Sequence, residues 1–153
     1  MKTTDFSKLE KKMNYTFKNK ELLKTAFTHK TFAFEAKTPV EYNERFEFLG
    51  DSILGFLVSK ELYKSNKYFS EGELTRRRAQ LVNNSFLYEK AKKMNLGKYL
   101  YLGRGEKMQN GTKNPTNLAN TLEALVGAVY LDSDIKTVWK FIKSNIFDEI
   151  TQF

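Results

Sequence analysis

Apolar residues along this chain recur every three or four positions, and no segment shows the strict alternation that is typical of a β-strand. Pro39 and Pro115 fall in polar stretches, and the glycine-rich segment 102–116 has no periodicity, so loops are expected there. The pattern therefore predicts an all-α fold, a single compact helical domain over residues 1–153. The expected helices lie near residues 6–13, 22–27, 41–64, 71–94 with a break at 83–84, 117–131 and 135–150.

The long helix predicted at 41–64 carries three carboxylates within an otherwise apolar segment. At about 100° per residue, Glu44, Glu47 and Asp51 fall on one face of this helix. Burying such groups costs several kcal/mol each unless a cation lies among them. Gly50 and Gly55 lower the helix propensity of the same segment, and we expect each to allow close approach of another backbone.

A second helix, predicted at 117–131, carries a similar polar row. Asn120 and Glu123 are three positions apart, and the remaining residues of this helix are mostly apolar. If the two helices meet, Glu47, Asp51, Asn120 and Glu123 converge. Oxygen ligands of this kind are those that Mg²⁺ prefers, and the site then suits metal-assisted phosphodiester hydrolysis.

Ion pairing offers a simpler explanation of the same acids. They could form salt bridges to Arg45, Arg76, Arg77 or Arg78 and serve only to stabilise packing, since structural ion pairs are commoner than active sites. Spacing alone leaves both interpretations open. The chain has no cysteine and one histidine, His29, which excludes thiolate sites and multi-histidine metal sites.

The charge balance favours a polyanionic partner. With 26 basic and 18 acidic residues the net charge is +8, as expected for a nucleic-acid-binding protein, although a solvated lysine-rich surface would give the same number. No apolar run reaches the roughly 18 residues of a membrane span, and the first residues lack the apolar core of a signal peptide. We therefore expect a cytoplasmic protein without a membrane partner.

Five segments of the chain resemble motifs of the ribonuclease III family and follow one another in the order that the family has, and the resemblance extends over residues 8–147. The hallmark segment is "NERFEFLGDSIL", which carries the first acidic row. The other four are "LLKTAFTHKTF", "EGELTRRRAQLVNN", "YLGRGE" and "NLANTLEALVGAVYLDSD". This resemblance favours the metal-site interpretation of the acids over the ion-pair interpretation.

The resemblance implies a helical endonuclease domain that acts as a homodimer on double-stranded RNA. It implies Mg²⁺ as the cofactor, with Mn²⁺ as a substitute, no organic cofactor, and products with 5′-phosphate and 3′-hydroxyl ends. It also implies that residues 1–153 are the nuclease domain alone, without the double-stranded-RNA-binding domain that usually follows. We further expect Phe46, Leu54, Val58 and Leu62 to pack across the dimer axis.

The same resemblance assigns roles to individual residues. Asp51 and Glu123 are expected to be catalytic, and both belong to the metal-ligand set with Glu47 and Asn120. Glu44 and Glu71 match acids that support the RNA-binding valley. Charge, and not the resemblance, suggests RNA-backbone contacts for Arg76, Arg77, Arg104, Lys107 and Lys113. A solvated face for the first two, and a mobile charged loop for the other three, explain the same residues equally well.

Asn120 departs from the family pattern, which has an aspartate there. An amide oxygen can ligate a metal ion but brings no charge, so metal affinity should fall. The alternative hypothesis is therefore a catalytically weakened or inactive dimeric module that binds or scaffolds structured RNA.

Overall fold

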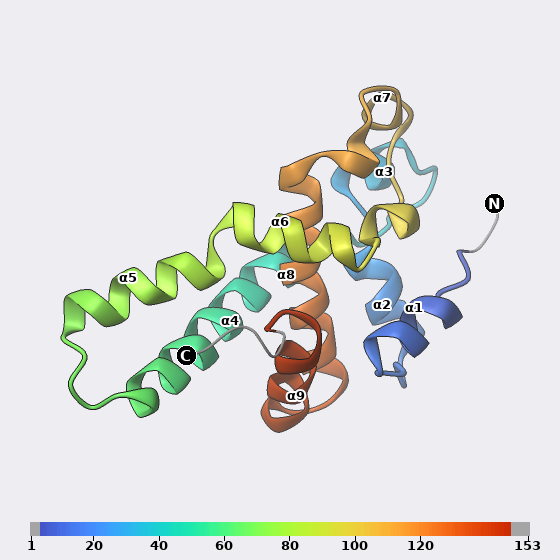
Figure 1. The fold of residues 1–153 in the computed structure, drawn as a ribbon. Helices are drawn as coiled ribbons and strands as arrows, with labels where there is room; N and C mark the ends of the chain where they lie inside the picture. Colours follow the sequence, from blue (N-terminus) through green and yellow to red (C-terminus); the bar gives the residue numbers. More distant parts are fainter. Residues whose placement is uncertain (1–3, 148–153) are drawn as a thin grey trace.

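The computed structural model describes residues 4–147, and helices dominate that part of the chain (Figure 1). The predicted all-α fold is confirmed. Within the described residues β-type pairing is limited to one isolated bridge between Thr28 and Tyr101. The α-helices are α1 (Ser7–Met13), α2 (Lys20–Ala26), α3 (Lys30–Glu35), α4 (Glu44–Ser65), α5 (Glu71–Val82), α6 (Asn84–Lys93), α7 (Arg104–Met108), α8 (Pro115–Asp132) and α9 (Ile135–Asn145), with 3₁₀ helices η1 (Leu96–Tyr99) and η2 (Gly111–Lys113).

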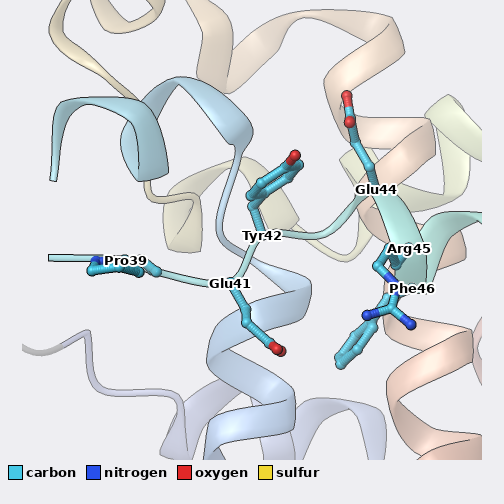
Figure 2. A pocket seen from close by; sticks show the side chains of 7 residues that line it. Pro39, Glu41, Tyr42, Glu44, Arg45 and Phe46 are labelled. Atoms are coloured by element: carbon cyan, nitrogen blue, oxygen red, sulfur yellow. The ribbon is translucent and has the colours of Figure 1, made fainter.

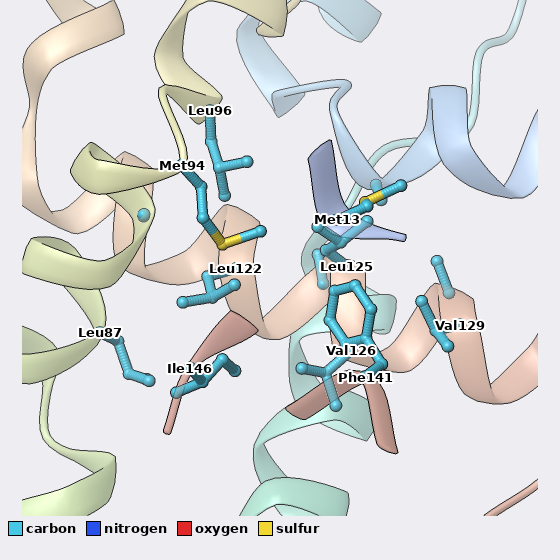
Figure 3. Close-up of a cluster of buried hydrophobic side chains, with 14 of the residues drawn as sticks. Met13, Leu87, Met94, Leu96, Leu122, Leu125, Val126, Val129, Phe141 and Ile146 are labelled. Atoms are coloured by element: carbon cyan, nitrogen blue, oxygen red, sulfur yellow. The ribbon is translucent and has the colours of Figure 1, made fainter. Parts of the chain in front are cut away.

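Helix α8 forms the centre of the domain. Its residues from Thr121 to Val129 are all buried, and α2, α4, α6 and α9 pack around it. Helices α4 and α5 form a hairpin that extends to one side of the molecule, while α3 and α7 lie together at another end (Figure 1). Figure 3 shows the core beside α8, where Leu122, Leu125 and Val126 meet apolar side chains from α1, α6 and α9.

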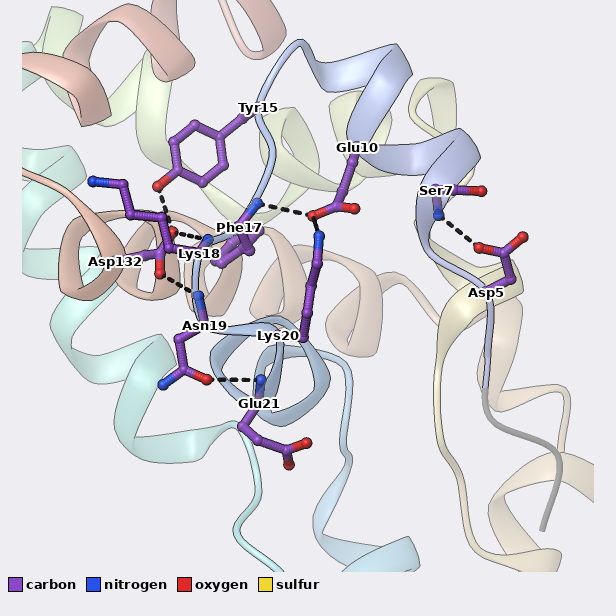
Figure 4. Close-up of polar contacts among 10 residues, drawn as sticks. All are labelled: Asp5, Ser7, Glu10, Tyr15, Phe17, Lys18, Asn19, Lys20, Glu21 and Asp132. Carbon is purple, nitrogen blue, oxygen red and sulfur yellow. Dashed lines mark hydrogen bonds and ion pairs between the residues drawn. The ribbon is translucent and has the colours of Figure 1, made fainter.

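Asp132, the last residue of α8, fixes the C-terminal end of this helix. Its carboxylate accepts hydrogen bonds from the Tyr15 hydroxyl (2.7 Å) and from the backbone N–H groups of Lys18 and Asn19 (both 2.9 Å; Figure 4). These bonds hold the segment between α1 and α2 against α8. They also keep the pKa of Asp132 below its ordinary value despite the opposing effect of burial.

The helix predictions were wrong in two places. Helix α3 was not expected, and the segment 102–116 is not all loop, because it contains α7, η2 and, from Pro115, the start of α8. Both α-helices are too short to show periodicity and depend on contacts distant in sequence: the N–H of Arg104 donates to Glu35, and the Asn117 amide donates to Glu106 (2.7 Å). The predicted break near 83–84 is confirmed. The last helix was predicted to reach 150, but α9 ends at Asn145; residues 148–150 lie outside the described part of the chain.

Gly50 lies where α4 and α8 touch, as predicted. A Cβ at Gly50 would stand 1.7 Å from the carbonyl oxygen of Glu123, and one at Gly127 would stand 2.4 Å from the carbonyl oxygen of Phe46. The same expectation was wrong for Gly55, where an added Cβ would meet nothing within 4 Å. Two glycines, one on each helix, therefore bring the acid-bearing backbones together.

Gly50→Ala should lower the free energy of unfolding by about 2–3 kcal/mol, because the added methyl forces the two helices apart. Gly55→Ala is the matched control on the same helix. It should raise the free energy of unfolding by up to about 1 kcal/mol, since alanine favours the helix and the site is open. Urea unfolding of both variants measures the difference, and equal effects would contradict a close approach at Gly50.

Candidate active site

The acid-bearing turn of α4 is held in place by Asn43. This buried residue immediately precedes α4, its backbone N–H donates to the carbonyl of Thr28 (2.9 Å), and its side-chain amide donates to the carbonyl of Ala26 (3.3 Å). The start of α4 is therefore tied to the end of α2. Sequence reasoning did not assign Asn43 this role; its position just before the acidic segment was the available signal.

Three of the four expected metal ligands are electrostatic neighbours. Burial raises the pKa of Glu123 to about 8, and the charges of Asp51 and Glu47 add to the shift. The pKa of Glu47 is raised by burial and then by the charges of Glu44 and Asp51. The Glu123 carboxyl belongs to a residue that is only 7% exposed, Glu47 is half-buried and Asp51 is exposed. The carboxylates thus form a row from the interior to the surface.

No cation of the described residues forms an ion pair with this row, and the charge of Lys30 is the smallest of the four effects on the pKa of Glu47. Within residues 4–147, Glu47, Asp51 and Glu123 form no ion pair with an arginine or a lysine, so the predicted arginine salt bridges are not what the structure shows. Glu44 pairs instead with Lys30, whose Nζ lies 2.9 Å from Glu44 Oε1. Burial is the main cause of the raised pKa values of Glu123 and Glu47, and the like charges of the row add to it.

Asn120 lies on the α4-facing side of α8, one turn before Glu123. It is half-buried, and its amide makes no hydrogen bond to another residue in the described range 4–147. The amide oxygen is therefore available as a ligand. It supplies no charge to the row, in contrast to the aspartate that the resemblance led us to expect.

The donor set fits a hard divalent cation in its chemistry. It combines three carboxylates and one amide oxygen on two rigid helices, with no paired cation. The side chains as they stand do not converge on one point, since no group of three or more His, Cys, Asp or Glu residues within 4–147 is arranged to hold a metal ion. Because Mg²⁺ keeps several waters and is completed by substrate phosphates, a looser acidic row is compatible with it.

The two supporting acids lie in different places. Glu44 begins α4 and points away from Arg45, beside a pocket of about 320 Å³ (Figure 2). Glu71 begins α5 and lines a groove with Ser59, about 18 Å along α4 from Glu47. Glu71 therefore does not join the acidic row within one copy of the chain.

The five basic residues expected to contact RNA do not form one cluster. Arg76 is exposed on α5, and the Arg77 guanidinium lies over the Phe69 ring, 4.0 Å from its centroid. Arg104 and Lys107 are exposed on α7 at another part of the molecule (Figure 1), and Lys113 lies in η2. Their contact with RNA stays a prediction.

The expected dimer contacts of α4 are contradicted by burial. Leu54, Val58 and Leu62 are at most 1% exposed and belong to the core of the domain, so they are unable to reach a second copy. Apolar residues occur on nearly all sides of α4, so sequence periodicity did not show which side faces the core of the domain. The exposed apolar residues of α4 are Phe48, Phe56 and Tyr63, at 78%, 60% and 75%.

The pH dependence of stability should report the buried carboxyl directly. Glu123 keeps its proton in the folded state up to about pH 8, whereas in the unfolded chain it releases the proton near pH 4.5. The unfolding free energy should therefore fall as pH rises from 4.5 to 8, by at most about 1.4 kcal/mol per pH unit from this group. Glu123→Gln should remove that contribution in urea unfolding at pH 5–8 with EDTA, while Glu61→Gln, a matched change on α4, should retain it.

Comparison with known proteins identifies the family to which this fold belongs. Residues 19–150 match the family model described as ribonuclease-III-like. The chain is 44% identical over 149 residues to ribonuclease 3 of Clostridium kluyveri, covering 97% of this chain and 61% of that protein. It is 47% identical over 135 residues to ribonuclease 3 of Buchnera aphidicola subsp. Acyrthosiphon pisum, covering 88% and 57%. The chain thus spans about three fifths of the length of these curated relatives.

Solved structures agree with this result. The crystal structure of the nuclease domain of ribonuclease III from Campylobacter jejuni is 33% identical, covers 99% of both chains and superposes with a TM-score of 0.88. A second structure of that domain, with a TM-score of 0.84, is described as showing structural flexibility in the region involved in dimer formation. None of the helices in residues 4–147 has the length and hydropathy to cross a membrane. By sequence and by fold, the chain belongs to the ribonuclease III family.

Proposed function

We propose that this domain is a Mg²⁺-dependent endoribonuclease that hydrolyses double-stranded RNA as a homodimer, leaving 5′-phosphate and 3′-hydroxyl ends. The observation that carries the proposal is the unpaired acidic row of Glu47, Asp51 and Glu123 in a chain of net charge +8. A purely structural row would be neutralised by the abundant lysines and arginines. A row left without cations is suited to receive a divalent ion together with a phosphate.

Each side chain of the row has a separate task. Buried Glu123 offers a carboxylate that strongly favours a cation, because its charge is poorly solvated. Exposed Asp51 lies at the surface end of the row, where an RNA phosphate can arrive. Half-buried Glu47 and Asn120 flank these two residues from α4 and α8. When bound there, Mg²⁺ would neutralise phosphate charge and lower the pKa of a bound water.

The homodimer is supported by the outer face of α4. Phe48, Phe56 and Tyr63 fall within about 80° of one another around the helix, so they form one exposed apolar stripe. Asp51 lies about 60° from Phe48, which places the acidic row beside the stripe. A second copy packed on this stripe would set two acidic rows near each other, as cutting both strands of a duplex requires.

Incubation of an end-labelled RNA duplex with the domain and Mg²⁺ tests the proposal. Cleavage with 5′-phosphate ends is expected, with no cleavage in EDTA and little cleavage of a single strand of the same sequence. If neither the natural chain nor an Asn120→Asp variant cleaves while the duplex is still bound, the alternative of a catalytically inactive RNA-binding module holds. Asn120, with its uncharged side chain, is the observation that favours that alternative.

Asn120→Asp should lower the Mg²⁺ concentration for half-maximal cleavage by about tenfold, because it adds a fourth carboxylate to the row. Asn84→Asp is the matched control: it makes the same amide-to-carboxylate change at an exposed position at the start of α6. Magnesium titrations of cleavage measure both variants. An equal effect of the two substitutions would show that general charge, and not a metal ligand, is responsible.

A further inference from the structure

A second pocket lies between α6, η1, η2 and the beginning of α8. Its volume is about 460 Å³, within the range of small-molecule sites. Gly97 forms part of its wall, where a Cβ would stand 2.0 Å from the carbonyl oxygen of Thr112. Direct contact between the two 3₁₀ segments therefore preforms the pocket. The polar side chains that line it are Tyr88, Lys92, Asn95, Lys98, Thr112 and Lys113.

This pocket is separate from the acidic row. Leu118 lines it from α8, and at about 100° per residue Leu118 lies about 160° around that helix from Asn120 and about 140° from Glu123. Asn120 and Glu123 lie on the side of α8 that faces α4, whereas the pocket lies on the opposite side of α8, against α6. A ligand in the pocket therefore does not touch the residues assigned to hydrolysis.

The lining of the pocket is basic and contains no acid. Lys92, Lys98 and Lys113 contribute three ammonium groups. Lys92 is partly offset by Glu89, 2.8 Å away, and lies over the Tyr88 ring at 4.9 Å from its centroid. Lys98 and Lys113 form no ion pair within residues 4–147. Ammonium groups gathered in a concave site are typical phosphate binders.

Neutral groups in the pocket suit the rest of a nucleotide. The hydroxyl of Thr112 and the amide of Asn95 can donate to or accept from a sugar or base, and Tyr88 adds an aromatic surface with a hydroxyl. We propose that this pocket is a nucleotide-phosphate site, in which Lys98 and Lys113 hold the phosphate. It takes either a free mononucleotide or a terminal nucleotide of an RNA strand, and it acts independently of cleavage at the acidic row.

Backbone-amide NMR of the whole chain in EDTA tests the site, with inorganic pyrophosphate, AMP and a 5′-phosphorylated five-nucleotide RNA as probes. Saturable shifts are expected at Asn95, Gly97 and Thr112 with at least AMP. Tighter binding of the RNA, with competition by AMP, identifies a strand terminus as the ligand. Equal or tighter binding of AMP identifies a free nucleotide.

Two double variants decide between a site and general charge. Lys98→Gln/Lys113→Gln should weaken AMP binding at least tenfold. Lys136→Gln/Lys140→Gln removes the same charge from exposed positions of α9 and should leave binding unchanged. Absence of shifts at Gly97 and Thr112 with every probe, or equal weakening by both double variants, would overturn the proposal. Glu123→Gln should bind AMP normally, so failure of the cleavage proposal is distinguishable from failure of this one.

Discussion

Replacing Glu123 by glutamine is expected to slow duplex cleavage about a thousandfold while leaving the domain folded. The carboxylate is the most buried member of the acidic row and the one whose charge is least solvated, so it gains most from a bound cation. An amide of the same shape keeps the packing but removes the charge. Loss of roughly 4 kcal/mol of transition-state stabilisation corresponds to that factor.

Glutamine is an unusually clean probe at this position. With a pKa of about 8, the Glu123 carboxyl of the metal-free domain is mostly neutral at pH 7, and glutamine resembles that neutral form. The variant should therefore be at least as stable as the natural chain in EDTA. Glu61→Gln on α4 is the control and should cleave at the normal rate. Single-turnover cleavage with Mg²⁺ measures both, and a Glu123→Gln rate within tenfold of normal would refute the assignment.

The fold was largely predictable because its long helices carry their own signals. Apolar periodicity located α4, α8 and α9. The pair Asn83-Asn84 indicated the break between α5 and α6, where the Asn83 side chain accepts a hydrogen bond from the N–H of Phe86. The short helices α3 and α7 were not predictable, since six and five residues cannot establish a period. Their stability comes from contacts with residues about seventy positions away.

The candidate site was predictable in its composition and only partly in its geometry. Spacing placed Glu47 and Asp51 on one face, and Gly50 signalled a close backbone approach that the structure shows to be to α8. Periodicity did not reveal that Glu44 pairs with Lys30, because that contact depends on how the loop before α4 folds. Periodicity also assigned the side of α4 that carries Leu54 to a partner, whereas the protein's own core covers that side.

If two copies pack on the exposed stripe of α4, as proposed, Phe48→Glu is expected to convert the dimer to monomers. The side chain is 78% exposed in one copy, so the substitution costs the isolated domain little, yet it would place a carboxylate on the apolar stripe that a second copy covers. Loss of an important aromatic contact in an interface costs about 2 kcal/mol, and a symmetric interface contains it twice. The dimer dissociation constant should therefore rise by about a thousandfold.

Sedimentation equilibrium measures this shift, with Met108→Glu as the control at an 85% exposed position on α7. Leu54→Glu would not serve, because it places a charge in the core and would unfold the domain. Cleavage by the Phe48→Glu monomer should fall together with dimerisation, and raising its concentration should restore both. If Phe48→Glu sediments as the natural chain does, the exposed stripe of α4 is not the surface on which two copies meet. Another face of the domain would then have to bring two acidic rows to one duplex.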